Sequence, residues 1–240
     1  MNQFGRLIPK DRSYEAKYPV GKLLGASGAV KSVERTLIIP FGLRSFYDQK
    51  SYNACTGFAA SWMMSIYNCI PQQKYDALWL YHAGQENDND PVTDPEADNG
   101  GYVWATFWAL QHLGHKKLRE ANPDIRDGIT AYYWAKSTDD VRAAIAIGRP
   151  VVIGVNWYEE FMAPLVYKGE YWIGKRPNLG KSLGGHAICI YGSSDKRQAH
   201  RLINSWGLSY PQVWLPYATF DRLMGEDGEA VIAIDNPKVT

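Results

Sequence analysis

The sequence predicts an α+β fold, with helices gathered in the first half of the chain and strands in the second. Apolar residues recur at helical spacing over residues 54–68. After residue 127 the pattern changes to short apolar runs rich in β-branched and aromatic residues, such as the one at 150–155, which are typical of buried strands. With 240 residues, of which 45% are hydrophobic and 13% aromatic, the chain is long and apolar enough to bury a large core.

The most clearly defined helix is expected from Ala54 to Asn68, with Asn53 as its N-cap and Pro71 at its end. The other expected elements are periodic apolar runs bounded by glycine, proline or polar turn residues. These are helices at 76–84, 102–113 and 141–147, the last capped from Ser137 and closed by Gly148, and strands at 36–39, 129–134, 150–155, 186–191, 201–204 and 230–234. The acidic segment 86–98 is expected to be a solvated loop.

We expect all of these elements to form a single unit, residues 1–240. A helical lobe should cover about 41–126 and a β-rich lobe about 127–236, with an arm, residues 1–40, packed on the unit.

Composition and charge exclude several classes of function. The net charge is +1, which gives no electrostatic reason to bind nucleic acid or an anionic membrane. No stretch approaches the roughly 18–20 apolar residues of a membrane span, and the first residues lack the apolar core of a secretory signal. The three cysteines, Cys55, Cys69 and Cys189, form neither a disulfide framework nor a zinc-ligand pattern. We therefore expect a cytoplasmic protein with free thiols and no metal.

Three residues in distinctive local contexts predict thiol chemistry. Cys55 opens the expected helix, where the partial positive charge of the first turn lowers the pKa of a thiol. His186 follows two glycines at the start of an expected strand, and Asn204 ends the neighbouring one. A base oriented by an amide and paired with a thiol is an activated nucleophile. Taken singly, such a cysteine is more often a small buried hydrophobe and such a histidine more often a structural residue.

Together with their flanking residues, these three positions resemble the papain family of cysteine peptidases, in the style of its short bacterial or viral members. The matching strings are Gln49 six residues before Cys55, Gly185-His186-Ala187, and Asn204-Ser205-Trp206-Gly207. The resemblance covers about residues 48–234. It implies a two-lobed fold with Cys55, His186 and Asn204 meeting in a cleft between the lobes.

By the same resemblance, the Gln49 side chain and the Cys55 backbone N–H form an oxyanion hole, and Trp206 shields the Asn–His hydrogen bond. The implied reaction is hydrolysis of a peptide or polypeptide substrate through a thioester acyl-enzyme, without a cofactor. The substrate-binding positions that the resemblance implies are Gly100, Gly101, Tyr102, Gly154, Ala187 and Trp206. Two of the three residues expected around the pocket for the second residue before the cut, Gly154 and Ala187, have little or no side chain. We therefore expect this pocket to be open, mostly apolar and selective for bulky aliphatic or aromatic side chains.

Departures from the family pattern affect the pockets and leave the four catalytic positions intact. Tyr52 and Thr56 stand where the family has a cysteine and a tryptophan. The 54 residues before Cys55 are too few for the long inhibitory pro-segment of lysosomal relatives, so we expect them to belong to the folded enzyme. Two alternatives stay open. One is another thiol acyl-transfer enzyme, a transglutaminase or a cell-wall peptide amidase, and the other is a catalytically silent peptide-binding module on the same fold.

Overall fold

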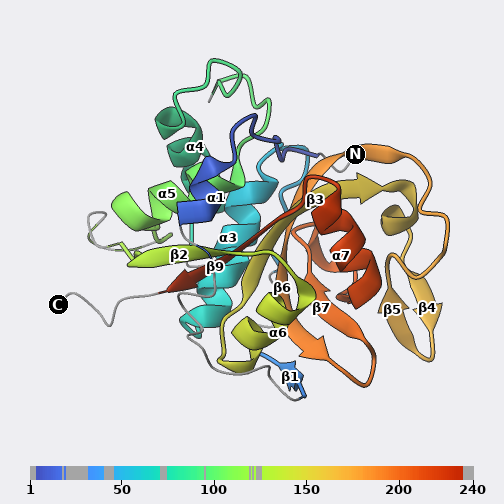
Figure 1. Cartoon of the computed structure of the whole chain (residues 1–240). Helices are drawn as coiled ribbons and strands as arrows, with labels where there is room; N and C mark the ends of the chain where they lie inside the picture. Colours follow the sequence, from blue (N-terminus) through green and yellow to red (C-terminus); the bar gives the residue numbers. More distant parts are fainter. Residues whose placement is uncertain are drawn as a thin grey trace.

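The computed structural model describes residues 4–17, 19, 32–40, 46–70, 75–94, 96–118, 120, 122 and 126–234. The expected helix end at Pro71 and a large part of the 1–40 arm lie outside these residues. Within them, helices and one large sheet form a mixed α+β fold (Figure 1). None of the helices in the described ranges has the length and apolar character that a membrane crossing requires.

Among the residues that the structure describes, the α-helices include the four that the sequence predicted and two that it did not predict. The expected ones are α3 (Cys55–Tyr67), α4 (Ala77–Asn87), α5 (Val103–His112) and α6 (Thr138–Ala146). As expected, the Ser137 side chain caps α6, accepting a hydrogen bond from the Asp140 N–H. The additional helices are α1 (Ser13–Lys17) in the arm and α7 (Tyr217–Gly225) near the end of the chain.

The strands join into a single nine-stranded sheet with the order β2-β9-β3-β6-β7-β8-β5-β4, and β1 pairs with β6 outside this path. All pairings are antiparallel except β5 with β8. The bounds are β1 (Glu34–Thr36), β2 (Ala131–Ala135), β3 (Val151–Tyr158), β4 (Leu165–Tyr167), β5 (Glu170–Trp172), β6 (Ser182–Ser194), β7 (Ala199–Ile203), β8 (Val213–Pro216) and β9 (Glu229–Ile234). The strand expected at 36–39 lies earlier in the chain, as β1, and the sequence did not predict β4, β5 and β8.

The sheet separates two hydrophobic cores because successive side chains of a strand point to opposite faces. On β6, Ala187 and Cys189 face the core under α3, α4 and α5, whereas Ile188 and Ile190 face the core under α6 and α7. The same alternation sends Val152 of β3 to the first core and its neighbours to the second. Helices therefore cover both faces of the sheet, and α3 lies directly against β6.

The start of α3 differs from the expectation. Ala54, not Asn53, occupies the N-cap position, and no side chain caps the helix. The Asn53 side chain instead donates to the Asp98 carbonyl at 2.6 Å, while the Asn53 N–H donates to the Asp98 carboxylate. The N–H groups of the first turn of α3 therefore have no side-chain cap as a partner.

The acidic segment 86–98 is not simply a solvated loop. The Asp98 carboxylate accepts hydrogen bonds from the Asn53 N–H and the Tyr81 hydroxyl. Asp90 accepts from the Tyr102 hydroxyl at 2.6 Å. These two carboxylates hold the segment against α4 and against the residues that precede α3 and α5, whereas the sequence analysis expected a solvated loop.

Candidate active site

His186 lies on β6, Asn204 comes directly after the adjacent antiparallel strand β7, and the two side chains are hydrogen-bonded to each other. This places the histidine Nε2 2.8 Å from the asparagine Oδ1. The same Oδ1 also accepts the Ser205 backbone N–H at 2.8 Å, which fixes the oxygen of the amide toward the ring. Nε2 must therefore carry the hydrogen, and a neutral His186 ring keeps its lone pair on Nδ1. Nδ1 is buried and has no hydrogen-bond partner among the residues that the structure describes.

Aromatic rings enclose His186. Trp157 meets it edge-on and Trp206 lies tilted beside it, each with ring centroids 4.8 Å from the histidine. Phe4 of the arm packs against both His186 and Trp206. The hydrogen bond to Asn204 thus lies in an apolar surrounding that excludes water and strengthens it. Trp157 had no distinguishing signal in the sequence, because it lies in a run of core residues.

Cys55 is the first residue of α3, and its thiol faces the backbone of β6. The backbone N–H groups of Ala187, Gly5 and Thr56 face the sulfur and favour its charged form. Both Cys55 and His186 have 0% of their surface exposed. Burial therefore raises the pKa of Cys55 to about 11 and lowers the pKa of His186 to about 4. The sequence predicted a lowered cysteine pKa, but in this closed arrangement desolvation outweighs the helix terminus.

Gln49 is fixed by the residue that follows Asn204. Its backbone N–H donates to the Ser205 carbonyl at 2.9 Å, and its side-chain Oε1 accepts the Ser205 hydroxyl at 2.9 Å. Its Nε2 donates to the Tyr52 carbonyl at 2.9 Å. A second backbone hydrogen bond, from the Gly207 N–H to the Tyr47 carbonyl, fastens the same two segments together. The segment before Cys55 and the Asn-Ser-Trp-Gly string are thereby held as one piece.

The chain's own residues 4–7 cover the cysteine and the histidine. This segment, Phe4 to Leu7, runs between the two glycine strings that the sequence indicated. The Gly101 N–H donates to the Gly5 carbonyl at 2.7 Å, and the Leu7 N–H donates to the Gly101 carbonyl at 3.0 Å. On the other side, the Arg6 N–H donates to the Gly185 carbonyl at 3.0 Å. The segment therefore bridges residues 101 and 185 through main-chain hydrogen bonds, with an isolated parallel β-bridge between Arg6 and Gly101.

The expected apolar pocket is wrong, because a buried carboxylate lies in it. Arg6 extends past Gly154 to Glu229, the first residue of β9, and the two side chains form an ion pair of 2.7 Å with 0% exposure on both. A Cβ on Gly154 would lie 2.9 Å from the Arg6 Nε, so the glycine makes room for the guanidinium. Neither Arg6 nor Glu229 stood out in the sequence, because they are separated by most of the chain.

The remaining predicted substrate-binding residues lie around this segment. Gly100 has a φ of 103°, a conformation that favours glycine, and its carbonyl accepts from the Gln85 side chain. Tyr102 is buried and bonded to Asp90 rather than pointing a free hydroxyl into the cleft. Ala187 is paired with Gly154 across β6 and β3. Ala187 therefore faces the Cys55 sulfur, Gly154 lies against Arg6, and Gly101 is hydrogen-bonded to residues 5 and 7.

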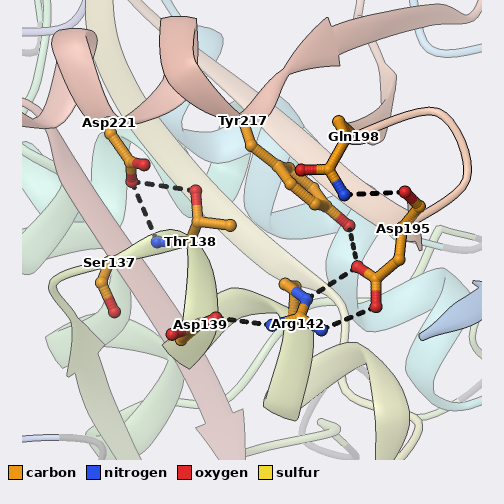
Figure 2. Close-up of a pocket in the computed structure, with 8 residues that line it drawn as sticks. All are labelled: Ser137, Thr138, Asp139, Arg142, Asp195, Gln198, Tyr217 and Asp221. Atoms are coloured by element: carbon orange, nitrogen blue, oxygen red, sulfur yellow. Dashed lines mark hydrogen bonds and ion pairs between the residues drawn. The ribbon is translucent and has the colours of Figure 1, made fainter. Parts of the chain in front are cut away.

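A second hollow, with a volume of about 500 Å³, lies away from Cys55 between α6, α7 and the turn after β6 (Figure 2). Its polar groups bind one another: Arg142 pairs with Asp139 and Asp195, Tyr217 donates to Asp195, and Thr138 donates to Asp221. These contacts tie α6 and α7 to the sheet. Across the ranges that the structure describes, no cluster of three or more histidine, cysteine or acidic side chains could hold a metal ion.

The fold is similar to solved structures of cysteine proteases. Xylellain, a cysteine protease from Xylella fastidiosa, superposes with a TM-score of 0.65 at 17% identity over 97% of this chain and 96% of its own. Procathepsin B from Trypanosoma congolense superposes with a TM-score of 0.67 at 13% identity over 98% of this chain and 87% of its own. Procathepsin L 3 of the Tenebrio molitor larval midgut gives a TM-score of 0.52 at 13% identity over 90% and 79%. No protein-family model and no curated protein matches the sequence. The chain has the α+β fold of papain-like cysteine proteases.

Proposed function

We propose that the chain is a cysteine endopeptidase, in one catalytic unit, in which Cys55 attacks a peptide carbonyl once residues 4–7 have left the cleft. One observation supports this above the others. The His186 ring donates through Nε2 to Asn204. Its buried Nδ1 has no hydrogen-bond partner among the described residues. The next residue, Ala187, faces the Cys55 sulfur. A ring oriented in this way accepts a thiol proton on Nδ1.

In the proposed reaction His186 takes the proton of Cys55, and the thiolate adds to the substrate carbonyl carbon. The developing oxyanion accepts hydrogen bonds from the Cys55 backbone N–H, in the uncapped first turn of α3, and from the Gln49 amide. His186 then donates its Nδ1 proton to the leaving amine, which departs and leaves a thioester. Water, deprotonated by His186, hydrolyses the thioester and restores the thiol. The substrate is a peptide or polypeptide, and three free thiols favour action in a reducing compartment such as the cytoplasm.

The test uses the full chain with Gly5→Ala, because a Cβ at residue 5 would lie 1.6 Å from the Asn53 carbonyl oxygen and must displace the covering segment. We expect this variant to cleave a mixed peptide library, measured by mass spectrometry. Adding Cys55→Ala should remove the cleavage by a factor on the order of 10⁶, the size expected when one member of a catalytic unit is lost.

Cys69→Ala in the same background is the matched control, because Cys69 is exposed and lies at the other end of α3. Its cleavage should stay close to that of Gly5→Ala alone. Cleavage that survives Cys55→Ala, or a folded Gly5→Ala protein that cleaves nothing, would contradict the proposed function.

A further inference from the structure

A hollow of about 260 Å³ lies where the parallel strands β5 and β8 begin. Its lining is mostly aromatic and apolar and includes one cation, and it consists of Phe46, Tyr171, Arg201, Leu208 and residues 210–212. We call it the Arg201 hollow. Two of its apolar side chains are open to solvent, since Leu208 has 71% and Tyr171 has 44% of its surface exposed. The hollow therefore combines exposed apolar surface with a single positive charge.

The Arg201 side chain is held in place by groups that do not neutralise its charge. Its guanidinium carbon lies 4.9 Å from the centroid of the Trp214 ring, and its Nε donates to the Tyr191 hydroxyl at 3.1 Å. That hydroxyl in turn donates to the Gln212 Oε1. Neither terminal nitrogen of Arg201 donates to a residue that the structure describes. The guanidinium is thus oriented before a ligand arrives, which reduces the entropic cost of binding.

Within the described ranges, no carboxylate forms an ion pair with Arg201. Glu170, whose charge Arg201 attracts without such a pair, accepts hydrogen bonds from Arg197 and from the Trp214 Nε1. In the hollow between α6 and α7, by contrast, the arginine already pairs with two aspartates. A guanidinium matches a carboxylate in both charge and hydrogen-bond geometry. The Arg201 hollow therefore favours a ligand that carries a carboxylate.

The Arg201 hollow adjoins the proposed catalytic site. Residues 4–7 run through that site from Trp206, which Phe4 contacts, to Gly101, to which the other end of the segment is hydrogen-bonded. Leu208 stands two residues after Trp206 and lines the hollow. A polypeptide that replaces residues 4–7 and continues past Trp206 is therefore brought close to Leu208. The hollow thus extends the proposed site on the side away from Gly101.

From this combination we propose that the Arg201 hollow binds an acidic side chain with aliphatic neighbours in a polypeptide. The carboxylate meets the terminal nitrogens of Arg201, and the aliphatic groups cover Leu208 and Tyr171, whose burial is favourable. A volume of about 260 Å³ suits a few side chains, because sites for drug-sized ligands run to roughly 300–1,000 Å³. The polypeptide is the substrate of the proposed peptidase, and for that identity, though not for the hollow itself, the proposal rests on the proposed function.

An NMR titration tests the hollow without requiring turnover. The full chain carrying Cys55→Ala, with residues 4–7 still in the cleft, is titrated at millimolar concentrations with acetyl-Leu-Glu-Leu-amide and with versions in which glutamine replaces the glutamate or serine replaces both leucines. We expect the backbone amide signals of Leu208 and Gln212 to shift while that of Gly101 stays in place. The Leu-Glu-Leu peptide should bind at least five-fold more tightly than either of the others. Equal binding of the three peptides, no shift at Leu208 and Gln212, or an equally strong shift with sulfate would overturn the proposal.

Two variants assign the binding to the hollow. Arg201→Gln removes the charge, and Leu208→Glu adds a carboxylate that repels the peptide and competes for Arg201. Both should weaken binding of the Leu-Glu-Leu peptide at least five-fold. Leu208 is exposed, so its substitution keeps the test decisive even if Arg201→Gln loosens the packing on Trp214. Leu118→Glu, at a position after α5 with 44% of its surface exposed and outside the hollow, is the matched control and should leave binding unchanged. Binding that persists in a folded Leu208→Glu chain would contradict the proposal.

Turnover then tests whether the ligand of the hollow is the substrate. In the Gly5→Ala background, Arg201→Gln should raise KM about ten-fold, with kcat unchanged, for substrates that carry Leu-Glu-Leu after the cut, and should not affect those that carry Ser-Gln-Ser there. An equal KM for both substrates before the substitution would remove the substrate assignment.

The two proposals fail in different ways. Peptide-dependent shifts at Leu208 and Gln212, together with no cleavage by the Gly5→Ala chain, would keep the hollow and remove the peptidase. Cleavage by the Gly5→Ala chain with no such shifts in the Cys55→Ala chain would do the reverse.

Discussion

Hydrogen-bond partners fix the orientation of two amide side chains, Asn204 and Gln49, in different ways. Asn204 presents its oxygen to His186, because that oxygen also accepts the Ser205 N–H. Gln49 presents its oxygen to the Ser205 hydroxyl, which turns its nitrogen toward Tyr52 and the start of α3. Ser205 therefore orients both amides, one through its backbone and one through its side chain.

In the Gly5→Ala background, Gln49→Ala should lower kcat by roughly 10² while KM changes little, because an oxyanion donor acts mainly in the transition state. Ser205→Ala should lower kcat less, by about ten-fold, since it removes one hydrogen bond that fixes the Gln49 amide. Ser205→Thr keeps a hydroxyl and should recover most of that loss. Steady-state kinetics on one peptide would measure all three, and an unchanged kcat in Gln49→Ala would remove Gln49 from the site.

The residues at the site differ in how far the sequence could predict them. Cys55, His186, Asn204 and Gln49 each stand in a local string of residues, so the sequence alone is enough to recognise their motifs. Arg6 and Glu229 stand in no recognisable motif, because what marks them is their ion pair, which joins residues far apart in the sequence. The expected apolar pocket was wrong for this reason, since the residue that decides its polarity comes from β9.

At the scale of elements, the position of α3 depends on its close contact with α4. A Cβ on Gly57 would lie 2.4 Å from the Ala77 carbonyl oxygen and 2.8 Å from the Tyr81 Cβ. The absence of a side chain at Gly57 therefore brings the two helices together and sets the depth at which Cys55 enters the site.

Gly57→Ala should accordingly lower the free energy of unfolding by about 1–3 kcal/mol, as overpacking of a tight contact does. Gly225→Ala is the matched control, because a Cβ there meets nothing within 4 Å at the end of α7. It should be neutral or slightly stabilising, since alanine is the better helix former. Urea unfolding of both variants would show the difference, and equal stabilities would contradict the close-contact argument.

The elements that the sequence missed have identifiable physical reasons. β4 and β5 are three residues each, so both are too short to show the alternating or continuous apolar pattern by which a strand is recognised. The helix α7 did carry a signal, with Tyr217, Phe220 and Leu223 spaced along one face after Pro216. Asn53 does not cap α3 as expected, because its side chain donates to the carbonyl of Asp98, a residue distant in sequence.

At the scale of the whole molecule, three buried histidines make stability depend on pH. Burial lowers the pKa of His115 to about 3, of His186 to about 4 and of His200 to about 3, against an ordinary value near 6.5. Below pH 6.5 the unfolded chain binds protons that the folded chain does not. The free energy of unfolding should therefore fall as the pH falls from 6.5 toward 4, by up to about 1.4 kcal/mol per pH unit for each histidine.

Urea midpoints at pH 7 and pH 5 would measure this dependence. His115→Gln or His200→Gln should make it shallower, whatever either change does to stability at pH 7. His112→Gln, at an exposed position on α5, is the matched control. A stability that rises on acidification in this window would contradict the assignment of neutral buried rings.

Residues 4–7 are covalently attached to the protein that they cover, so dilution should not release them from the cleft. The segment is joined through residues 8–12 to α1, which begins at Ser13 and packs on β2, so residues 4–7 are tethered close to the cleft. A tethered ligand has an effective concentration set by the tether, on the order of millimolar for short flexible links, and this value does not change with the amount of protein. If the chain is the proposed peptidase, dilution should therefore not activate it, as it would if the same peptide were a separate molecule. A substrate would compete against this constant effective concentration of residues 4–7, which raises the apparent KM and leaves the limiting rate at saturation unchanged.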